Sequence, residues 1–95
     1  MMSDWKRILD QIEELRVTKN WKQTDSLRVL AKSLVVESNE LLELFLNDEQ
    51  HKEAIANELA DVLMYALSMA ADLQLDIDEI IRDKIAIVQS RNYEH

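Results

Sequence analysis

The chain contains neither glycine nor proline among its 95 residues, and this absence limits its fold more than any other feature. Glycine serves tight turns and proline interrupts helices, so both common helix breakers are missing. The many Leu, Ala, Glu, Lys and Gln residues favour helix. The sequence therefore predicts an all-α protein with short polar links. It also excludes glycine-rich phosphate loops and nucleophile elbows.

Cysteine and net charge exclude further classes. With no cysteine, the chain has no disulfide, thiolate nucleophile or cysteine-bound metal. It carries 19 acidic and 11 basic residues, a formal charge of −8. Such a surface argues against nucleic-acid binding, which depends on neutralising phosphates. A small polyanion remains possible where metal ions invert the local field.

The spacing of apolar residues predicts four helices in a single domain, residues 1–95. The first follows possible caps at Ser3 and Asp4 and ends within residues 17–21. The second starts after a cap within residues 24–26 and runs to about residue 46. A polar link at 47–51 leads to the third, at about 52–73. Asp76 and Glu79 form a capping box for the fourth, which runs to about residue 91.

The two middle helices are long enough to form an antiparallel hairpin, each roughly 30 Å long. With the outer helices covering it, the protomer would be four-helix bundle-like. Apolar residues beyond one bundle's needs predict a homo-oligomer; these are Val35, Leu42, Leu63, Leu67 and Ile87. We expect a cytoplasmic protein without membrane contact, because no signal peptide is visible and the most hydrophobic stretch, 62–71, is too short to span a bilayer.

A carboxylate interrupts the leucine seam of the second helix. The seam runs through Leu27, Leu30, Leu34, Leu41 and Leu44, with Glu37 in its middle. A carboxylate there is costly without a partner, a raised pKa or a metal. Glu40 projects from the next turn of the same face.

The third helix carries a second acidic pair, Glu58 and Asp61, beside its own apolar stripe. In an antiparallel hairpin, the two pairs lie at similar distances from the turn and face each other. Four converging carboxylates repel one another unless cations neutralise them, and oxygen ligands suit Mg²⁺ or Mn²⁺. A single E-x-x-E pattern usually belongs to a solvated face, but two opposed pairs favour a metal site.

Four further residues are candidates for substrate binding. Trp21 and Tyr65 could stack on a base or simply pack. Lys84 and Arg91, on and after the last helix, could reach a phosphate or extend from the edge of the core into water. The two histidines, His51 and His95, lie in the link and at the terminus, which disfavours a ferritin-like di-iron site.

The acidic segments 37–40 (ESNE) and 58–61 (ELAD) resemble the ExxE…ExxD signature of the MazG-like all-α nucleoside triphosphate pyrophosphohydrolases. The resemblance covers about residues 21–91. It implies Mg²⁺-dependent cleavage of a nucleoside triphosphate to the monophosphate and pyrophosphate, by a homotetramer or homodimer. Glu37, Glu40, Glu58 and Asp61 match the family's metal-binding catalytic positions.

The same resemblance implies that Trp21 and Tyr65 contact the base and that Lys84 contacts the phosphates. It departs from some members near the base pocket, where residues 24–26 (TDS) replace a histidine-containing stretch, and after Lys84, where an asparagine is absent. We expect a nucleotide-pool housecleaning enzyme that accepts several deoxynucleotides, dCTP first.

Two other functions stay open: a catalytically silent helical interaction module, and a phosphoribosyl-ATP pyrophosphohydrolase. The presence of all four carboxylates favours the enzyme over the silent module. The match at Trp21 and Tyr65 favours the nucleotide-pool group over the phosphoribosyl-ATP enzyme.

Overall fold

The computed structural model describes residues 4–46 and 51–91, and this part of the chain contains five α-helices and no strand. The helices are α1 (Asp4–Thr18), α2 (Trp21–Thr24), α3 (Leu27–Glu43), α4 (Lys52–Asp72) and α5 (Ile77–Ser90). The all-α prediction is confirmed, and the four predicted helices correspond to α1, α3, α4 and α5. The single turn α2 was not predicted. Ser3, His95 and link residues 47–50 lie outside the described residues.

The caps predicted for the second and fourth helices form at the starts of α3 and α5. The Ser26 side chain accepts a hydrogen bond from the Val29 amide at 3.3 Å, and Asp76 accepts one from the Glu79 amide at 3.1 Å. Without glycine, Gln74 takes the left-handed conformation that closes α4, with φ 57°. The next amide, of Leu75, donates to the Ala70 carbonyl at 2.9 Å, as in a Schellman motif.

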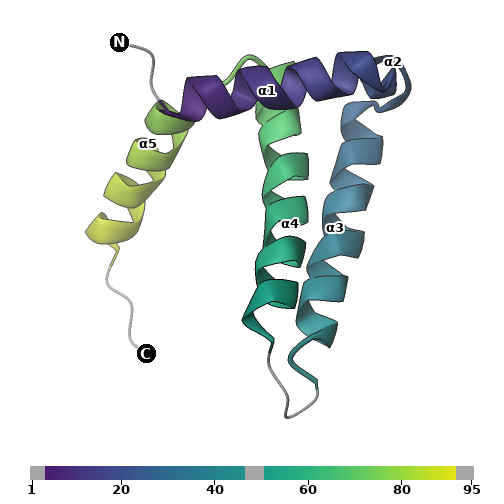
Figure 1. The fold of residues 1–95 in the computed structure, drawn as a ribbon. Helices are drawn as coiled ribbons and strands as arrows, with labels where there is room; N and C mark the ends of the chain where they lie inside the picture. The colour runs from purple at the N-terminus through teal and green to yellow at the C-terminus, as the bar shows by residue number, and fades with distance from the viewer. Residues whose placement is uncertain (1–3, 47–50, 92–95) are drawn as a thin grey trace.

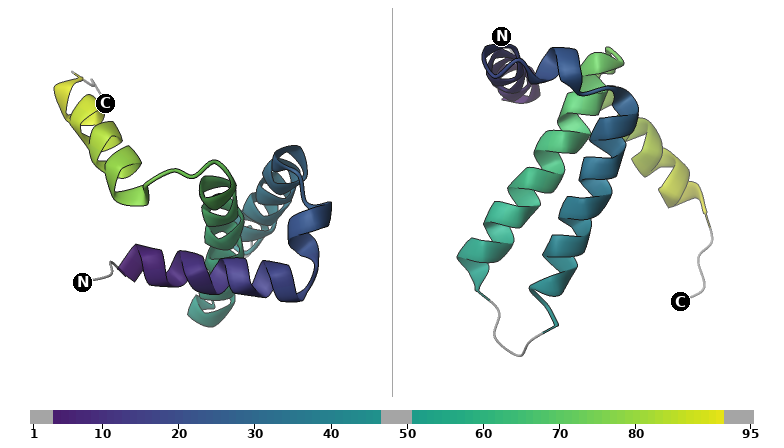
Figure 2. Two further views of the ribbon diagram at one scale, coloured as in Figure 1. Left: turned by 90° about the horizontal axis from the view of Figure 1, so that it is seen from above. Right: turned by 90° about the vertical axis from the view of Figure 1, so that its right-hand side faces the viewer.

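Helices α3 and α4 run antiparallel, side by side, and α1 lies across their upper ends (Figure 1). The top and side views in Figure 2 show α5 leaving the end of α4 at an angle and standing apart from the hairpin. The central hairpin is therefore confirmed. Within the protomer, however, α1 covers one end of the hairpin, not its length, and α5 does not cover it at all.

The buried core lies where α1 crosses α4. It consists of Ile12, Leu67, Ala70 and Ile77, with Leu9 and Met64 packed against it. Leu67 is only 8% exposed, so its predicted role in an oligomer surface is wrong. It turns inward because α1 covers this end of α4.

The acidic pair of α4 is less exposed than part of the apolar stripe predicted for this helix, which comprises Ile55, Leu59, Val62, Ala66, Met69 and Leu73. Glu58 and Asp61 are half-buried, whereas Leu59 and Leu73 are 46% and 50% exposed.

By length and composition, the whole of α4 is apolar enough to cross a membrane. The hydrophobic segment is therefore longer than the stretch 62–71 that the sequence indicated. Central helices of soluble proteins have the same composition, and acidic residues are costly inside a bilayer.

A network of ion pairs fixes α1 and α2 to the end of α4. Arg16 is 3% exposed and donates to both carboxylate oxygens of Asp72, at 3.1 and 2.9 Å. Lys22 of α2 bridges Asp72 and Glu13 at 3.2 and 2.8 Å. Glu13 also pairs with Arg16 at 3.3 Å, so it belongs to this network instead of being an ordinary surface charge.

We expect Asp72→Asn to destabilise the fold by about 3 kcal/mol at pH 7, because it leaves the buried Arg16 poorly paired. The hydrogen bond from Arg16 holds the pKa of Asp72 below its usual value. Its stabilisation is therefore present at neutral pH and lost as pH falls through the lowered pKa.

Thermal unfolding from pH 7 to pH 2 checks this, and the variant should lose less stability on acidification than the wild type. The control is Asp10→Asn, since Asp10 pairs with Lys6 while 55% exposed. That exposed pair is worth less than about 1 kcal/mol. Equal acid sensitivity of the wild type and D72N would contradict the role of Asp72.

Candidate metal centre and adjoining cavity

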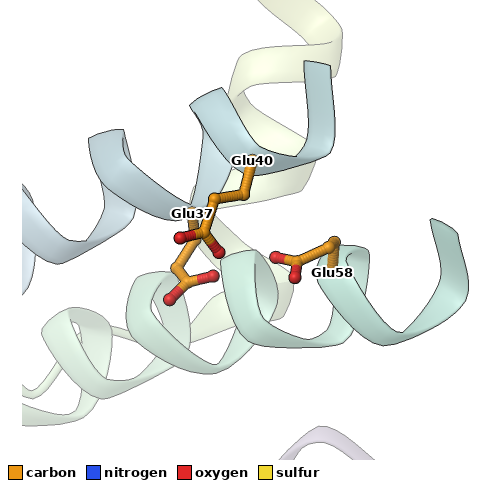
Figure 3. Close-up of side chains that lie close together, drawn as sticks. All are labelled: Glu37, Glu40 and Glu58. Atoms are coloured by element: carbon orange, nitrogen blue, oxygen red, sulfur yellow. The ribbon is translucent and has the colours of Figure 1, made fainter. Parts of the chain in front are cut away.

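Three carboxylates converge between the two hairpin helices. Glu37 and Glu40 project from adjacent turns of α3 toward Glu58 of α4 (Figure 3). One oxygen from each carboxylate lies within 4.8 Å of the others. Glu37 and Glu58 are half-buried, and Glu40 is exposed. The prediction that the acidic pairs face each other across the hairpin is met by these three residues.

The electrostatics of this cluster favour a cation. The facing Glu58 carboxyl raises the pKa of Glu37, with partial burial and the charge of Asp61 acting in the same direction. Glu37 in turn raises the pKa of Glu40. One oxygen each of Glu37 and Glu58 is buried and has no hydrogen-bond partner in the part of the chain that the structure describes. Buried oxygens without donors and mutual repulsion are the features that a hard divalent cation would satisfy.

Asp61, the fourth predicted carboxylate, is not part of this close group. It lies one turn further along α4 and lines a cavity of about 430 Å³ beneath α1. Its charge nonetheless acts on Glu37. Asp61 therefore lies at the boundary between the carboxylate cluster and the cavity, where its carboxylate can contact either a cation in the cluster or a ligand in the cavity.

The cavity brings together the two aromatic residues that the sequence singled out. Trp21 of α2 and Tyr65 of α4 both line it, with apolar walls from Ile12, Leu30 and Met64. Its volume lies within the usual range of small-molecule pockets. Trp21 and Tyr65, both expected to contact the base, thus line one cavity together with Asp61, and their contact with a base stays a prediction.

The predicted cations do not join this site within the protomer. Lys84 lies on α5 and Arg91 caps its end, and α5 stands apart from α3 and α4 in Figures 1 and 2. Neither residue lines the cavity. The resemblance implied that Lys84 contacts the phosphates, but the chain leaves α4 in a direction that only the tertiary structure fixes.

Two charged residues of the cavity were missed by sequence reasoning. Arg16 and Asp25 both line it, from α1 and from the residue that ends α2. Asp25 belongs to the predicted capping segment 24–26, which also departs from the family pattern near the base pocket, but the sequence assigned it no role. The sequence does contain a signal for Arg16. It follows the apolar Ile12 by four residues, so both side chains lie on the same side of α1, the side that faces α4.

The comparisons with known proteins agree with this picture. The model of the MazG-like family matches residues 17–93, so the chain belongs to that family. This confirms the relationship suggested by the two acidic motifs, and it makes the protein an all-α pyrophosphohydrolase by class.

A crystal structure described as that of a pyrophosphatase from Archaeoglobus fulgidus DSM 4304 superposes with a TM-score of 0.88 at 23% sequence identity. The alignment covers 99% of this chain and 96% of that one. At this identity the likeness concerns the fold. No curated protein sequence matches the chain.

The carboxylate cluster predicts a stability change that depends on divalent metal. Without metal, Glu37→Gln should raise the melting temperature, because it removes one charge facing Glu58. Millimolar Mg²⁺ or Mn²⁺ should raise the wild-type melting temperature by mass action, and the variant should lose most of that response.

Calorimetry or dye-monitored melting with and without EDTA measures both effects. Glu14→Gln on exposed α1 is the matched control and should respond to metal as the wild type does. If E37Q shows the full wild-type response to Mg²⁺, the cation binds elsewhere.

Proposed function

We propose that the protein is a Mg²⁺-dependent nucleoside triphosphate pyrophosphohydrolase that releases a nucleoside monophosphate and pyrophosphate. Mn²⁺ is the expected substitute. One observation carries the proposal: a cluster of three carboxylates adjoins a cavity with two aromatic residues, and Asp61 connects them. Such a pairing suits a ligand with a polyanionic tail at one end and a flat heterocycle at the other.

In this proposal, Glu37, Glu40, Glu58 and Asp61 hold the divalent cation and form the catalytic group. Bound ions of this kind neutralise charge on phosphates and lower the pKa of a bound water. Glu40 is the most exposed member of the close cluster and is therefore best placed to orient the attacking water. Trp21 of α2 and Tyr65 of α4, which line the same cavity, hold the base.

The substrates are proposed to be deoxynucleoside triphosphates of the cytoplasmic pool, with dCTP favoured. Aromatic packing discriminates weakly among bases, which is compatible with a housecleaning role. We propose no nucleic-acid or membrane partner, because the net charge is −8 and the acidic residues of α4 belong to the site.

The expected products test this function directly. Incubation of dCTP with Mg²⁺ should give dCMP and pyrophosphate, resolved by anion-exchange chromatography. Glu58→Gln should lower kcat by at least about 100-fold, since a charge that holds the cation is lost, and Glu14→Gln should retain wild-type activity. Release of dCDP and orthophosphate would contradict cleavage between the α and β phosphates. Inert triphosphates would favour the silent interaction module.

We also propose that the protomer assembles into a homodimer or homotetramer. Its accessible surface is 7852 Å², whereas a compact monomer of this mass exposes about 5,700 Å². Its radius of gyration is 15.7 Å, against about 12 Å for a compact domain of this length. The excess, about 2,150 Å² per protomer, is larger than the roughly 800 Å² that each partner buries in a standard interface and suits the larger interfaces of obligate oligomers.

Large apolar side chains are exposed on all five described helices, and we place the interface on three of them: α3 (Val35, Leu42), α4 (Leu59, Leu63) and α5 (Ile81, Ile85, Ile87). A second copy packed on these faces would bury them. It would also give Lys84 and Arg91 a route to the phosphates, because α5 of one protomer could then lie near the hairpin of another. Within one protomer α5 has no such neighbour.

Light scattering at micromolar concentration should therefore give a mass of two or four chains. Ile81→Glu and Leu63→Glu should each shift the protein toward monomer, because they place a charge in the proposed interface. Val17→Glu, on an exposed part of α1 outside these faces, is the control and should leave the mass unchanged. A wild-type monomer would overturn the assembly.

A further inference from the structure

We propose that Lys22 is a positioning residue that holds Trp21 in the cavity wall through two ion pairs, so that high ionic strength loosens Trp21 and weakens the binding of an aromatic ring. The inference rests on the proposed function only in taking that ring to be the base of a nucleotide. Trp21 lines the cavity, whereas Lys22, the next residue of α2, does not. The affinity of the base is thus assigned to a side chain that does not touch it.

The helix that carries Trp21 is too short to be stable alone. α2 has four residues, and isolated helices of fewer than about twelve residues are marginal in water. Its N-cap, Asn20, makes no side-chain hydrogen bond to the first turn and takes a left-handed conformation, φ 62°, that favours glycine. The Trp21 carbonyl accepts hydrogen bonds from the Asp25 amide and the Thr24 hydroxyl, both in the same segment. These bonds shape the turn but do not attach it to the other helices.

Packing holds Trp21 only in part. Trp21 shares the cavity wall with Ile12 and Leu15 of α1 and with Leu30 of α3, yet it is 44% exposed. No residue of α2 is buried. An indole with this exposure can leave the wall through a small movement of α2. Its position therefore depends on contacts that attach α2 to its neighbours.

Lys22 supplies these contacts. Its ammonium lies 2.8 Å from a carboxylate oxygen of Glu13 on α1 and 3.2 Å from one of Asp72 on α4. In the part of the chain that the structure describes, these are the only side-chain polar contacts between α2 and another helix. Arg16 already pairs with both carboxylates, at 3.3 and 2.9 Å, so the acceptors are in place before Lys22 joins them. Fixed acceptors reduce the entropy that an ion pair loses on forming.

The same geometry makes the contact sensitive to salt. The Lys22 side chain is 42% exposed, whereas that of Arg16 is 4% exposed. Salt screens exposed charges much more than buried ones. Salt should therefore release Lys22, and α2 with it, while the Arg16–Asp72 pair still holds α1 on α4. An uncharged ring has no ionic attraction of its own, so a loss of its affinity with salt measures the loosening of the wall.

The first test needs no ligand. Trp5 and Trp21 are the two tryptophans of the chain, so acrylamide quenching in a Trp5→Phe background measures the exposure of Trp21 alone. Lys22→Met removes the charge and keeps the apolar stem. It should raise the quenching constant about twofold, because the exposed fraction can rise from 44% toward that of a free side chain. Lys22→Arg should restore the wild-type value. Lys19→Met is the control, since exposed Lys19 makes no ion pair within the described residues.

Salt is the second variable in this test. Raising NaCl from about 0.01 M to about 1 M should increase Trp21 quenching in the wild-type background and in K19M, and should leave K22M unchanged. A melting curve at each salt concentration establishes that the protein stays folded. If K22M does not fold, the salt series on the wild-type background decides the matter.

The third measurement concerns the base. Deoxycytidine, which is uncharged, should bind the wild type about three- to tenfold more weakly at high salt, and K22M equally weakly at both concentrations. With dCTP and Mg²⁺ at low salt, K22M should raise KM by a similar factor and keep kcat near the wild-type value. This split is expected because Trp21 contacts the base equally before and during the reaction. A merely structural role of Lys22 would lower kcat through loss of folded enzyme.

The outcomes distinguish this inference from the proposed function. Unchanged Trp21 quenching in K22M, or quenching that salt does not alter in the wild-type background, overturns the positioning role whether or not triphosphates are hydrolysed. Loosening of Trp21 with unchanged or absent deoxycytidine binding overturns its effect on the ligand. Loosening of Trp21 with weakened deoxycytidine binding, but without hydrolysis of any triphosphate, supports the role of Lys22 and overturns the proposed activity.

Discussion

Electrostatic repulsion between Glu37 and Glu58 across the α3–α4 hairpin is the constraint around which the rest of the structure is organised. The hairpin brings like charges together between two helices, where apolar side chains would pack with less cost. Such an arrangement persists only if other contacts hold the helices in place. The leucines of α3 and the core beneath α1 supply those contacts, and a cation would remove the repulsion itself.

The Arg16–Asp72 pair has a second role besides fixing α1 to α4. Because Asp72 holds the guanidinium from one side, Arg16 remains inside the cavity wall and does not extend into water. The same ion-pair network includes Lys22 of α2, the helix that carries Trp21. The positions of Trp21 and of Arg16 in the cavity wall thus depend on one set of ion pairs. These ion pairs link the stability of the fold to the shape of the cavity.

Much of the fold was predictable from local signals. The missing helix breakers, the apolar spacing and the caps at Ser26 and Asp76 correctly indicated four of the five helices. The single turn α2 was not predictable, because four residues carry too little periodicity. The burial of Leu67 and the exposure of Leu59 were also missed, since periodicity marks an apolar side of α4 but does not say which neighbour covers it.

The sequence by itself determined the helices, the two acidic motifs and their facing heights, because i, i+3 spacing and antiparallel pairing are properties of the chain and its turn. Only the tertiary structure decided that Asp61 borders the cavity and that Arg16 and Asp25 share its wall. It also decided that α5 leaves the hairpin with its cations. These depend on the direction of the turn at Gln74 and on the crossing of α1 over α4, and the crossing arises from contacts between residues far apart in the sequence.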